Sequence, residues 1–125
     1  MRQRLRRGEP APDDATVIIR GDELDPDALR ATAEDNHRQF GFFGISVFAE
    51  TRNQRWYDRA ERFSKHRWIV LFTAGDLYTA GLALWDTGQS PHYDVVHDAL
   101  DELVRRILAT PHRQYPNPFH EEGQS

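Results

Sequence analysis

The sequence predicts a single α+β domain in which a mixed, mostly antiparallel sheet carries three to four packed helices. Three observations lead to this fold class. Short runs rich in β-branched and aromatic residues alternate with stretches of helical periodicity. Two neighbouring strand-like runs are joined by a short loop containing glycine and proline, which is typical of antiparallel strands. The length of 125 residues fits one domain.

Composition divides the chain into a central domain and two tails. Residues 1–15 are rich in arginine, proline and aspartate, so we expect a disordered N-terminal tail. The domain should cover residues 16–115, and the polar residues 116–125 should form a flexible C-terminal tail. Four arginines make the N-terminal tip basic: Arg2, Arg4, Arg6 and Arg7. Such an arm can contact phosphates, although a solvated terminus is the simpler interpretation.

The domain should begin with a buried strand and a helix. Residues 16–20 form a nearly continuous apolar run that ends at Gly21. A helix over residues 26–39 should follow, because Asp25 can cap it and proline is favoured at its first position. Its inner face is expected to carry Leu29, Ala33, His37 and Phe40.

Two further strands and two short helices are expected next. Residues 44–48 predict a strand, with Ser46 and Phe48 on one face. A helix over residues 54–65 should bury Trp56, Ala60 and Phe63. Residues 68–72 are the most hydrophobic run and predict a central strand. Residues 73–76 are expected to form the cap of a short helix over residues 77–81.

A hairpin and an amphipathic helix complete the domain. The turn at residues 86–91 should join two strands, and alternation in the second places His92, Asp94 and Val96 on one face. Asp98 is expected to cap a helix ending near Thr110. Its apolar residues recur with helical spacing: Leu100, Leu103, Val104, Ile107 and Leu108. Residues 112–115 predict a short last strand.

Composition also excludes several classes of protein. The absence of cysteine excludes disulfide frameworks, thiolate zinc sites and cysteine nucleophiles, and makes a cytoplasmic location the expected one. No run approaches the roughly 20 apolar residues of a membrane span, and no apolar segment typical of a secretory signal follows the N-terminal arginines. The net charge of −4 gives no global argument for nucleic-acid binding.

Familiar motifs are missing from the sequence. It contains no phosphate-binding P-loop, no dinucleotide-binding glycine pattern, no His-Glu-x-x-His helix and no serine-hydrolase elbow, so we predict no cofactor. A zinc site from His92, Asp94 and a remote histidine, His37 or His120, is conceivable by residue type. The spacing does not favour it, and we predict no metal.

The candidate catalytic residues are His92 and Asp94, with Arg20 and Ser46 as supporting groups. A carboxylate beside an imidazole can fix its tautomer and raise its pKa, as a general base or acid near neutral pH requires. Metal-free RNA cleavage needs little more than a base, an acid and a cation. The alternative is that His92 and Asp94 are solvated residues of an edge strand. His97 falls on the opposite face and is more simply a residue of the helix cap.

Phe42 and Phe43 are the candidate partner-binding residues. They lie between two glycines, Gly41 and Gly44, which can expose them. An exposed pair of aromatic rings would mark a surface for another protein. Packing in the core is the alternative.

Arg20 and Ser46 also resemble the first two signature positions of ADP-ribosyltransferase-type NAD-binding domains. In that family the arginine and the serine organise the NAD pocket, and a glutamate on a later strand is catalytic. This sequence departs from the pattern, because its later glutamates, Glu102, Glu121 and Glu122, do not fall on a predicted strand.

Three strings of sequence resemble a group of short, uncharacterised actinobacterial proteins. They are VIIRG at residues 17–21, GFFGISVF at residues 41–48 and WDTGQSPHYDVVH at residues 85–97. The resemblance covers roughly residues 16–119 and implies no activity. The small size and the lack of a large cofactor site are compatible with a toxin or a defence component.

These observations predict a small cytoplasmic bacterial protein of toxin–antitoxin or defence type, whose His92 and Asp94 act on RNA or a nucleotide substrate. The alternative is a non-catalytic module that pairs with a partner protein or a second copy of the chain. No membrane is expected among its partners. Convergence of the four candidate residues in space would favour chemistry, and their dispersal would favour binding.

Overall fold

The computed structural model of the protein describes residues 12–22, 24–86 and 92–120. The strands in these ranges are β1 (Val17–Gly21), β2 (Gly44–Ala49), β3 (Trp68–Thr73), β4 (Ala83–Asp86), β5 (His92–Val96) and β6 (Arg113–Pro116). The helices are α1 (Pro26–Phe40), α2 (Trp56–Glu61), α3 (Ala74–Thr79) and α4 (Leu100–Ala109). The basic tip, the turn at residues 87–91 and the glutamates at positions 121 and 122 lie outside the described residues.

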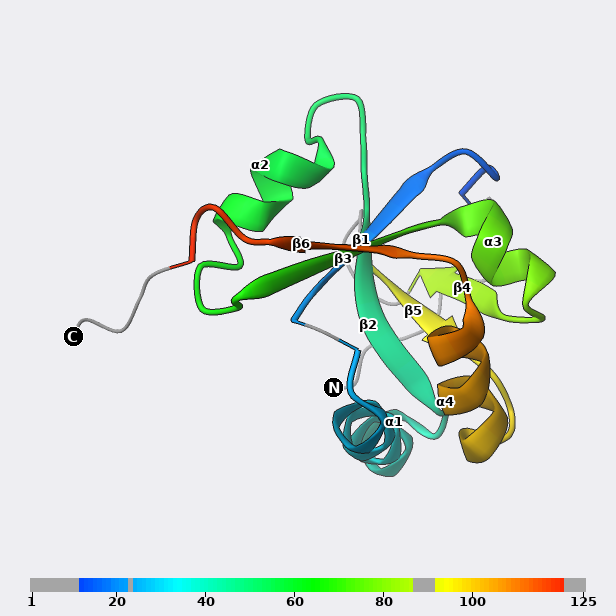
Figure 1. Ribbon diagram of the computed structural model, residues 1–125. Helices are drawn as coiled ribbons and strands as arrows, with labels where there is room; N and C mark the ends of the chain where they lie inside the picture. The colour runs from blue at the N-terminus through cyan, green and yellow to red at the C-terminus, as the bar shows by residue number, and fades with distance from the viewer. Residues whose placement is uncertain (1–11, 23, 87–91, 121–125) are drawn as a thin grey trace.

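The described strands form one six-stranded sheet in the order β4-β5-β2-β1-β3-β6 (Figure 1). Every described pairing in the sheet is antiparallel. The predicted α+β fold is therefore confirmed, with an antiparallel sheet where a mixed one was expected. The predicted hairpin partners β4 and β5 pair directly, and the short last strand pairs with β3.

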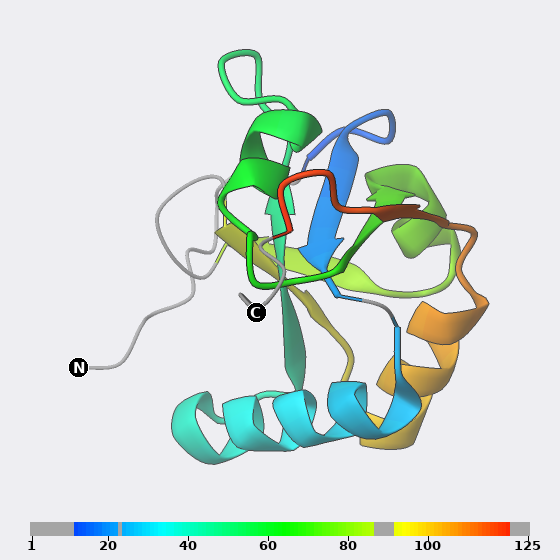
Figure 2. The same ribbon diagram turned by 60° about the vertical axis from the view of Figure 1, so that its left-hand side comes forward.

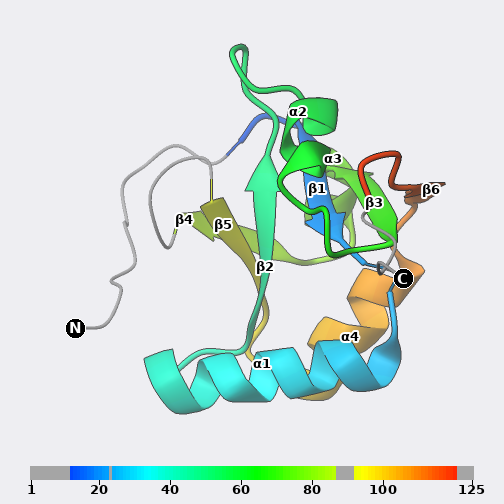
Figure 3. The same ribbon diagram turned by 90° about the vertical axis from the view of Figure 1, so that its left-hand side faces the viewer.

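The helices pack on both faces of the sheet. Figures 2 and 3 show α1 and α4 side by side below it, with α2 on the opposite side. The larger core lies between one sheet face and α1, α3 and α4, and includes Ile18, Val95 and Leu103. A smaller core lies under α2, where Ala60 packs on Ile19 and Ile69. Each fully buried aliphatic side chain contributes about 1.5–3 kcal/mol, so the larger cluster dominates stability.

Helix α1 begins and ends where the sequence predicts. A carboxylate oxygen of Asp25 accepts a hydrogen bond from the Ala28 N–H at 2.8 Å, and Gly41 ends the helix with a φ of 87°. The prediction that His37 faces inward is wrong, because its side chain is exposed. At 3.6 residues per turn, position 37 lies about 80° around the helix from Leu29, whereas position 36 lies only about 20° away.

Helix α4 buries the predicted face, but its cap differs. The N-cap residue is Ala99, and the exposed Asp98 precedes it. The Ala99 N–H donates to Nδ1 of His97 at 2.9 Å. The prediction of Asp98 as the cap is therefore wrong by one residue, and His97 acts at the junction. At the other end, Arg106 donates to the Ala80 carbonyl at 2.8 Å and joins α4 to the end of α3.

Helix α2 is shorter than predicted and is held at both ends by side chains from elsewhere. A carboxylate oxygen of Glu50 accepts from the Trp56 N–H at 3.0 Å. Asn117, which is only 5% exposed, donates from Nδ2 to the carbonyls of Ala60, Phe63 and His66 at 3.3, 3.0 and 3.0 Å. Residue 117, assigned from the sequence to a tail, thus packs against the domain.

The start of the described chain also contacts the domain. The Tyr78 hydroxyl donates to the Pro12 carbonyl at 2.6 Å, and the Gly75 N–H donates to the Asp14 carbonyl at 2.9 Å. Helix α3 is capped within the expected stretch, because the Thr73 hydroxyl accepts a hydrogen bond from the Asp76 N–H, and the helix begins at Ala74, three residues before Leu77. Within the described ranges, no helix has the length and hydropathy needed to cross a membrane.

Candidate functional site

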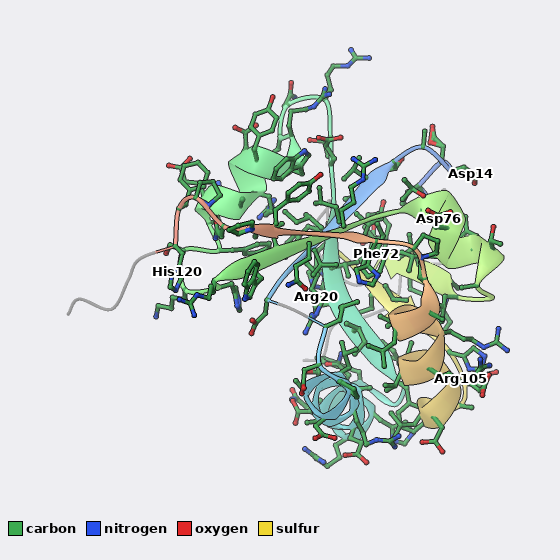
Figure 4. All side chains as sticks on the ribbon, in the orientation of Figure 1. Asp14, Arg20, Phe72, Asp76, Arg105 and His120 are labelled. Carbon is green, nitrogen blue, oxygen red and sulfur yellow. The ribbon has the colours of Figure 1, made fainter. Side chains whose placement is uncertain are left out.

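The four predicted site residues meet around Ser46. Nε2 of His92 lies 3.2 Å from Oγ of Ser46. Nη1 of Arg20 donates to the carbonyl of Ser46 at 2.9 Å. Asp94 is the residue opposite Ser46 in the register of β2 and β5. Figure 4 shows Arg20 near the middle of the sheet. Three strands therefore bring the predicted residues together.

The site exists because β1 separates from β2. The described ladder between them pairs Ile18 with Ala49 and Ile19 with Phe48. In an antiparallel pair, alternate residues of one strand direct their backbone groups to the same neighbour. The backbone groups of Ser46 and Gly44 therefore point to the same edge of β2 as those of Phe48. At Ser46 and Gly44, β1 no longer lies along that edge. A buried carbonyl at such a gap needs another donor.

Two side chains supply these donors. Arg20 reaches the Ser46 carbonyl, and Nδ2 of Asn36 donates to the Gly44 carbonyl at 2.6 Å. Nδ2 of Asn36 also lies 3.4 Å from Oδ1 of Asp94. Asn36 was not predicted from the sequence. Its position on the same face of α1 as Leu29 is the signal that could have indicated it, because a polar residue there is partly buried and needs a partner.

Asp94 is a buried carboxylate at the centre of this group. It is 4% exposed and packs over Gly44. A Cβ atom at position 44 would lie 3.2 Å from Cβ of Asp94 and 2.6 Å from Cε2 of Phe42. Glycine is therefore required at position 44 to let the Asp94 and Phe42 side chains lie across β2.

Arg20 carries the positive charge of the site. Burial lowers its pKa, and the carboxylates of Asp22 and Asp94 raise it and so offset part of that effect. An arginine remains protonated at neutral pH in proteins, so the guanidinium is a cation held next to the Ser46 carbonyl. Within the described part of the chain, its buried Nε has no hydrogen-bond partner.

His92 is positioned by aromatic contacts as well as by Ser46. Its ring meets Phe48 edge-on, with centroids 5.1 Å apart and an interplanar angle of 76°. Phe48 in turn packs on Phe63 and lies beneath the guanidinium of Arg59, 4.3 Å from the ring centroid. The imidazole therefore lies between a hydroxyl and an apolar wall.

The interpretation of His92 and Asp94 as solvated edge-strand residues is wrong. Strand β5 pairs with β4 on one side and with β2 on the other, so it is internal. His97 lies beyond the end of β5 and lines a different pocket with Phe42 and Trp85. As alternation predicted, it does not join His92.

The predicted partner-binding residues are partly buried. Phe43 stacks on His37 at 4.3 Å, and Phe42 packs on Trp85 at 5.5 Å. Together they border a cavity of about 200 Å³. Trp85, on the edge strand β4, is 36% exposed, whereas Phe42 and Phe43 are partly buried.

The described residues offer neither a metal site nor a glutamate on a strand. No set of three or more histidine, aspartate or glutamate side chains suited to a metal ion occurs in the described ranges. None of the described strands contains a glutamate. Glu102 lies on α4, where hydrogen bonds from Arg105 and Arg106 lower its pKa to about 2. It therefore does not supply the strand glutamate of the ADP-ribosyltransferase pattern.

Comparison with protein-family models, with curated proteins and with solved structures finds no match to this chain. Function must therefore be inferred from the geometry of the site, since an α+β fold by itself does not define one.

Proposed function

We propose that this protein is a small cytoplasmic bacterial effector, of toxin–antitoxin or defence type, that acts on RNA or a nucleotide substrate by acid–base chemistry. The observation that carries the proposal is the 3.2 Å contact between Nε2 of His92 and Oγ of Ser46, beside the cation of Arg20. A base, a hydroxyl and a cation within one group of side chains suit reactions in which an oxygen attacks phosphorus.

His92 is the proposed proton carrier. Its Nε2 already contacts one hydroxyl, so it can equally accept the proton of a ribose 2′-hydroxyl bound beside Ser46. The 2′-oxygen then forms a bond to phosphorus, and the bond from phosphorus to the 5′-oxygen breaks. The proton held by His92 passes to the departing 5′-oxygen. The products are a 2′,3′-cyclic phosphate and a free 5′-hydroxyl.

Arg20 and Asp94 are the proposed electrostatic partners of this step. Negative charge develops on the phosphate oxygens, and a cation held away from bulk water stabilises it strongly. Arg20 is oriented by the Ser46 carbonyl, and the charges of Asp22 and Asp94 favour its protonated form. Asp94 is itself contacted by Asn36, so its carboxylate is fixed before substrate binds.

Growth of a bacterial host after induction tests the proposal. The wild type should arrest growth, and His92→Ala and Asp94→Ala variants that remain folded should not. His97→Ala is the matched control, because this histidine contacts Ala99 and is not part of the Ser46 group. Arrest by the His92→Ala variant equal to that of the wild type would contradict the proposal.

A second candidate function is pairing with a protein, and Trp85 is the observation that favours it. Tryptophan is enriched at the energetic centres of protein interfaces, and this one is 36% exposed above Phe42 on an edge strand. Affinity purification should then recover a partner, or a second copy, with the wild type and lose it with Trp85→Ser. Tyr57→Ser, which removes an exposed ring on α2, is the control.

A further inference from the structure

A second cavity lies where α2 and β6 meet over β3. Its volume is about 420 Å³, within the range of roughly 300–1,000 Å³ that is usual for small-molecule sites. Figure 1 shows α2 and α3 on two sides of the strands that form its floor. Arg20, Ser46, His92 and Asp94 do not line this cavity. It is therefore distinct from the site described above.

One wall of the cavity is a pair of aromatic rings. Trp56 of α2 and Tyr115 of β6 are nearly parallel, with centroids 5.7 Å apart and an interplanar angle of 13°. Tyr57 meets Trp56 edge-on, with centroids 5.7 Å apart and an interplanar angle of 80°. Tyr115 is 36% exposed, so the wall is open to a ligand. Planar rings of this kind are the surfaces on which nucleobases stack in proteins.

The pairing of β3 with β6 places the cation of Arg113 next to this wall. Arg113 is opposite Leu71 and Tyr115 is opposite Ile69 in the pairing of β3 with β6. Residues two apart on a strand share a face, so the guanidinium and the phenol ring lie on the same side of β6. Arg113 is exposed and lines the cavity. A guanidinium is the group that best binds phosphate with two parallel hydrogen bonds.

A carboxylate lines the cavity from another element. Asp76 lies in the first turn of α3, and its backbone N–H donates to the Thr73 hydroxyl at 3.2 Å. Figure 4 shows Asp76 on α3, with Phe72 on the neighbouring part of β3. The floor between Asp76 and the aromatic wall includes the apolar residues Val17 and Leu71. By strand register, Arg113 lies between this carboxylate and the aromatic wall, so Asp76 marks the far end of the cavity.

We propose that this cavity binds a purine nucleotide, with its base on the Trp56–Tyr115 wall and its phosphate at Arg113. A purine offers more ring area for stacking than a pyrimidine does. The same chemistry belongs to a free mononucleotide and to a nucleotide within single-stranded RNA. The inference stands on the cavity itself and does not depend on the activity proposed for His92.

Calorimetric titration of the full chain tests this inference. Adenosine or guanosine monophosphate should bind at least about tenfold more tightly than ribose 5-phosphate, because the base stacks on the wall. Trp56→Leu should remove most of that difference, and Trp56→Phe should retain part of it. Tyr115→Leu changes an exposed side chain and provides a second test if Trp56→Leu fails to fold.

Arg113→Gln separates the phosphate contact from stacking. It should weaken binding of the monophosphate by about tenfold and leave binding of adenosine unchanged. Arg67→Gln, on an exposed arginine that does not line the cavity, is the matched control and should change neither. Tighter binding of a short purine oligoribonucleotide than of the monophosphate would identify RNA as the source, and equal binding would identify the free nucleotide.

Two results would overturn the inference. One is equal affinity for ribose 5-phosphate and the monophosphate, and the other is unchanged nucleotide affinity in both Trp56→Leu and Tyr115→Leu. If nucleotide binding is lost in His92→Ala but retained in both Trp56→Leu and Tyr115→Leu, the nucleotide binds at Ser46 instead. The protein could bind a nucleotide in the cavity and yet neither cut RNA nor affect growth. That result would support the nucleotide site and contradict the activity proposed for His92.

Discussion

The carbonyl of Ser46 accepts a hydrogen bond from the guanidinium of Arg20 at 2.9 Å, at a place where a continuous ladder would supply a backbone N–H. The same substitution occurs two residues earlier, where Asn36 serves Gly44 at 2.6 Å. Side chains thus complete the hydrogen bonding of β2 after β1 leaves it. The candidate site is the polar group that this opening creates within the sheet.

Asn36→Leu should lower the free energy of unfolding by about 1–3 kcal/mol, because leucine has a similar size but leaves a buried carbonyl without its donor. Denaturant unfolding of the purified variant measures this change. Asn53→Leu, at an exposed position, is the control and should fall within about 0.5 kcal/mol of the wild type. An equal effect of the two substitutions would show that the Asn36 contact does not stabilise β2.

Gly44→Ala should destabilise the fold by about 1–3 kcal/mol through overpacking. Its added methyl group would lie 2.6 Å from the Phe42 ring, next to Asp94, in a buried position. Gly41 is the informative comparison, since a Cβ there meets nothing within 4 Å but has to tolerate a φ of 87°. Gly41→Asn should therefore be tolerated better than Gly44→Ala, because asparagine adopts this backbone conformation more readily than other residues. The reverse order of thermal midpoints would refute this account of position 44.

Asn117→Leu should cost about 1–3 kcal/mol, because three carbonyls at and beyond the end of α2 lose a buried donor. Gln114→Leu provides a control on the exposed strand β6. Thermal unfolding of both variants distinguishes them. If Asn117→Leu has the same thermal midpoint as the wild type, the contacts of residue 117 do not stabilise α2.

The contribution of Glu102 to the stability of the fold should depend on pH. Arg105 and Arg106 lower its pKa from 4.5 to about 2, so the folded state favours the ionised carboxylate more than the unfolded state does. The contribution to stability is therefore complete above the unfolded pKa and is lost as the pH falls from about 4.5 toward 2. Thermal midpoints of the wild type and Glu102→Gln should differ at pH 6 and converge near pH 2. A difference that is constant over this range would contradict the assigned cause.

Local patterns predicted much of the fold. Helix α4 follows from its apolar spacing, and α1 follows from Asp25, Pro26 and Gly41 around a periodic segment. These signals act within a few residues, so they are readable without knowledge of the tertiary structure. The cap of α4 was misplaced by one residue because Asp98 has the favoured chemistry while His97 makes the observed contact.

Long-range contacts could not be read in the same way. Asn117 contacts carbonyls more than 50 residues earlier, and the composition around it resembles that of a tail. Asn36 is significant only because β1 has already left β2 before Gly44, which depends on the order of strands in the sheet. The convergence of Arg20, Ser46 and His92 was anticipated as a condition for chemistry, but their spacing along the chain did not establish it.

Incubation of purified protein with RNA, followed by analysis of the cleaved ends, tests the central claim most directly. The account predicts 2′,3′-cyclic phosphate and 5′-hydroxyl ends with the wild type. Cleavage should be at least about a hundredfold slower with His92→Ala and unchanged with His97→Ala. An RNA that stays intact with the wild type, or is cut equally fast by the His92→Ala variant, would contradict the claim that the Ser46–His92 group is a catalytic site for RNA.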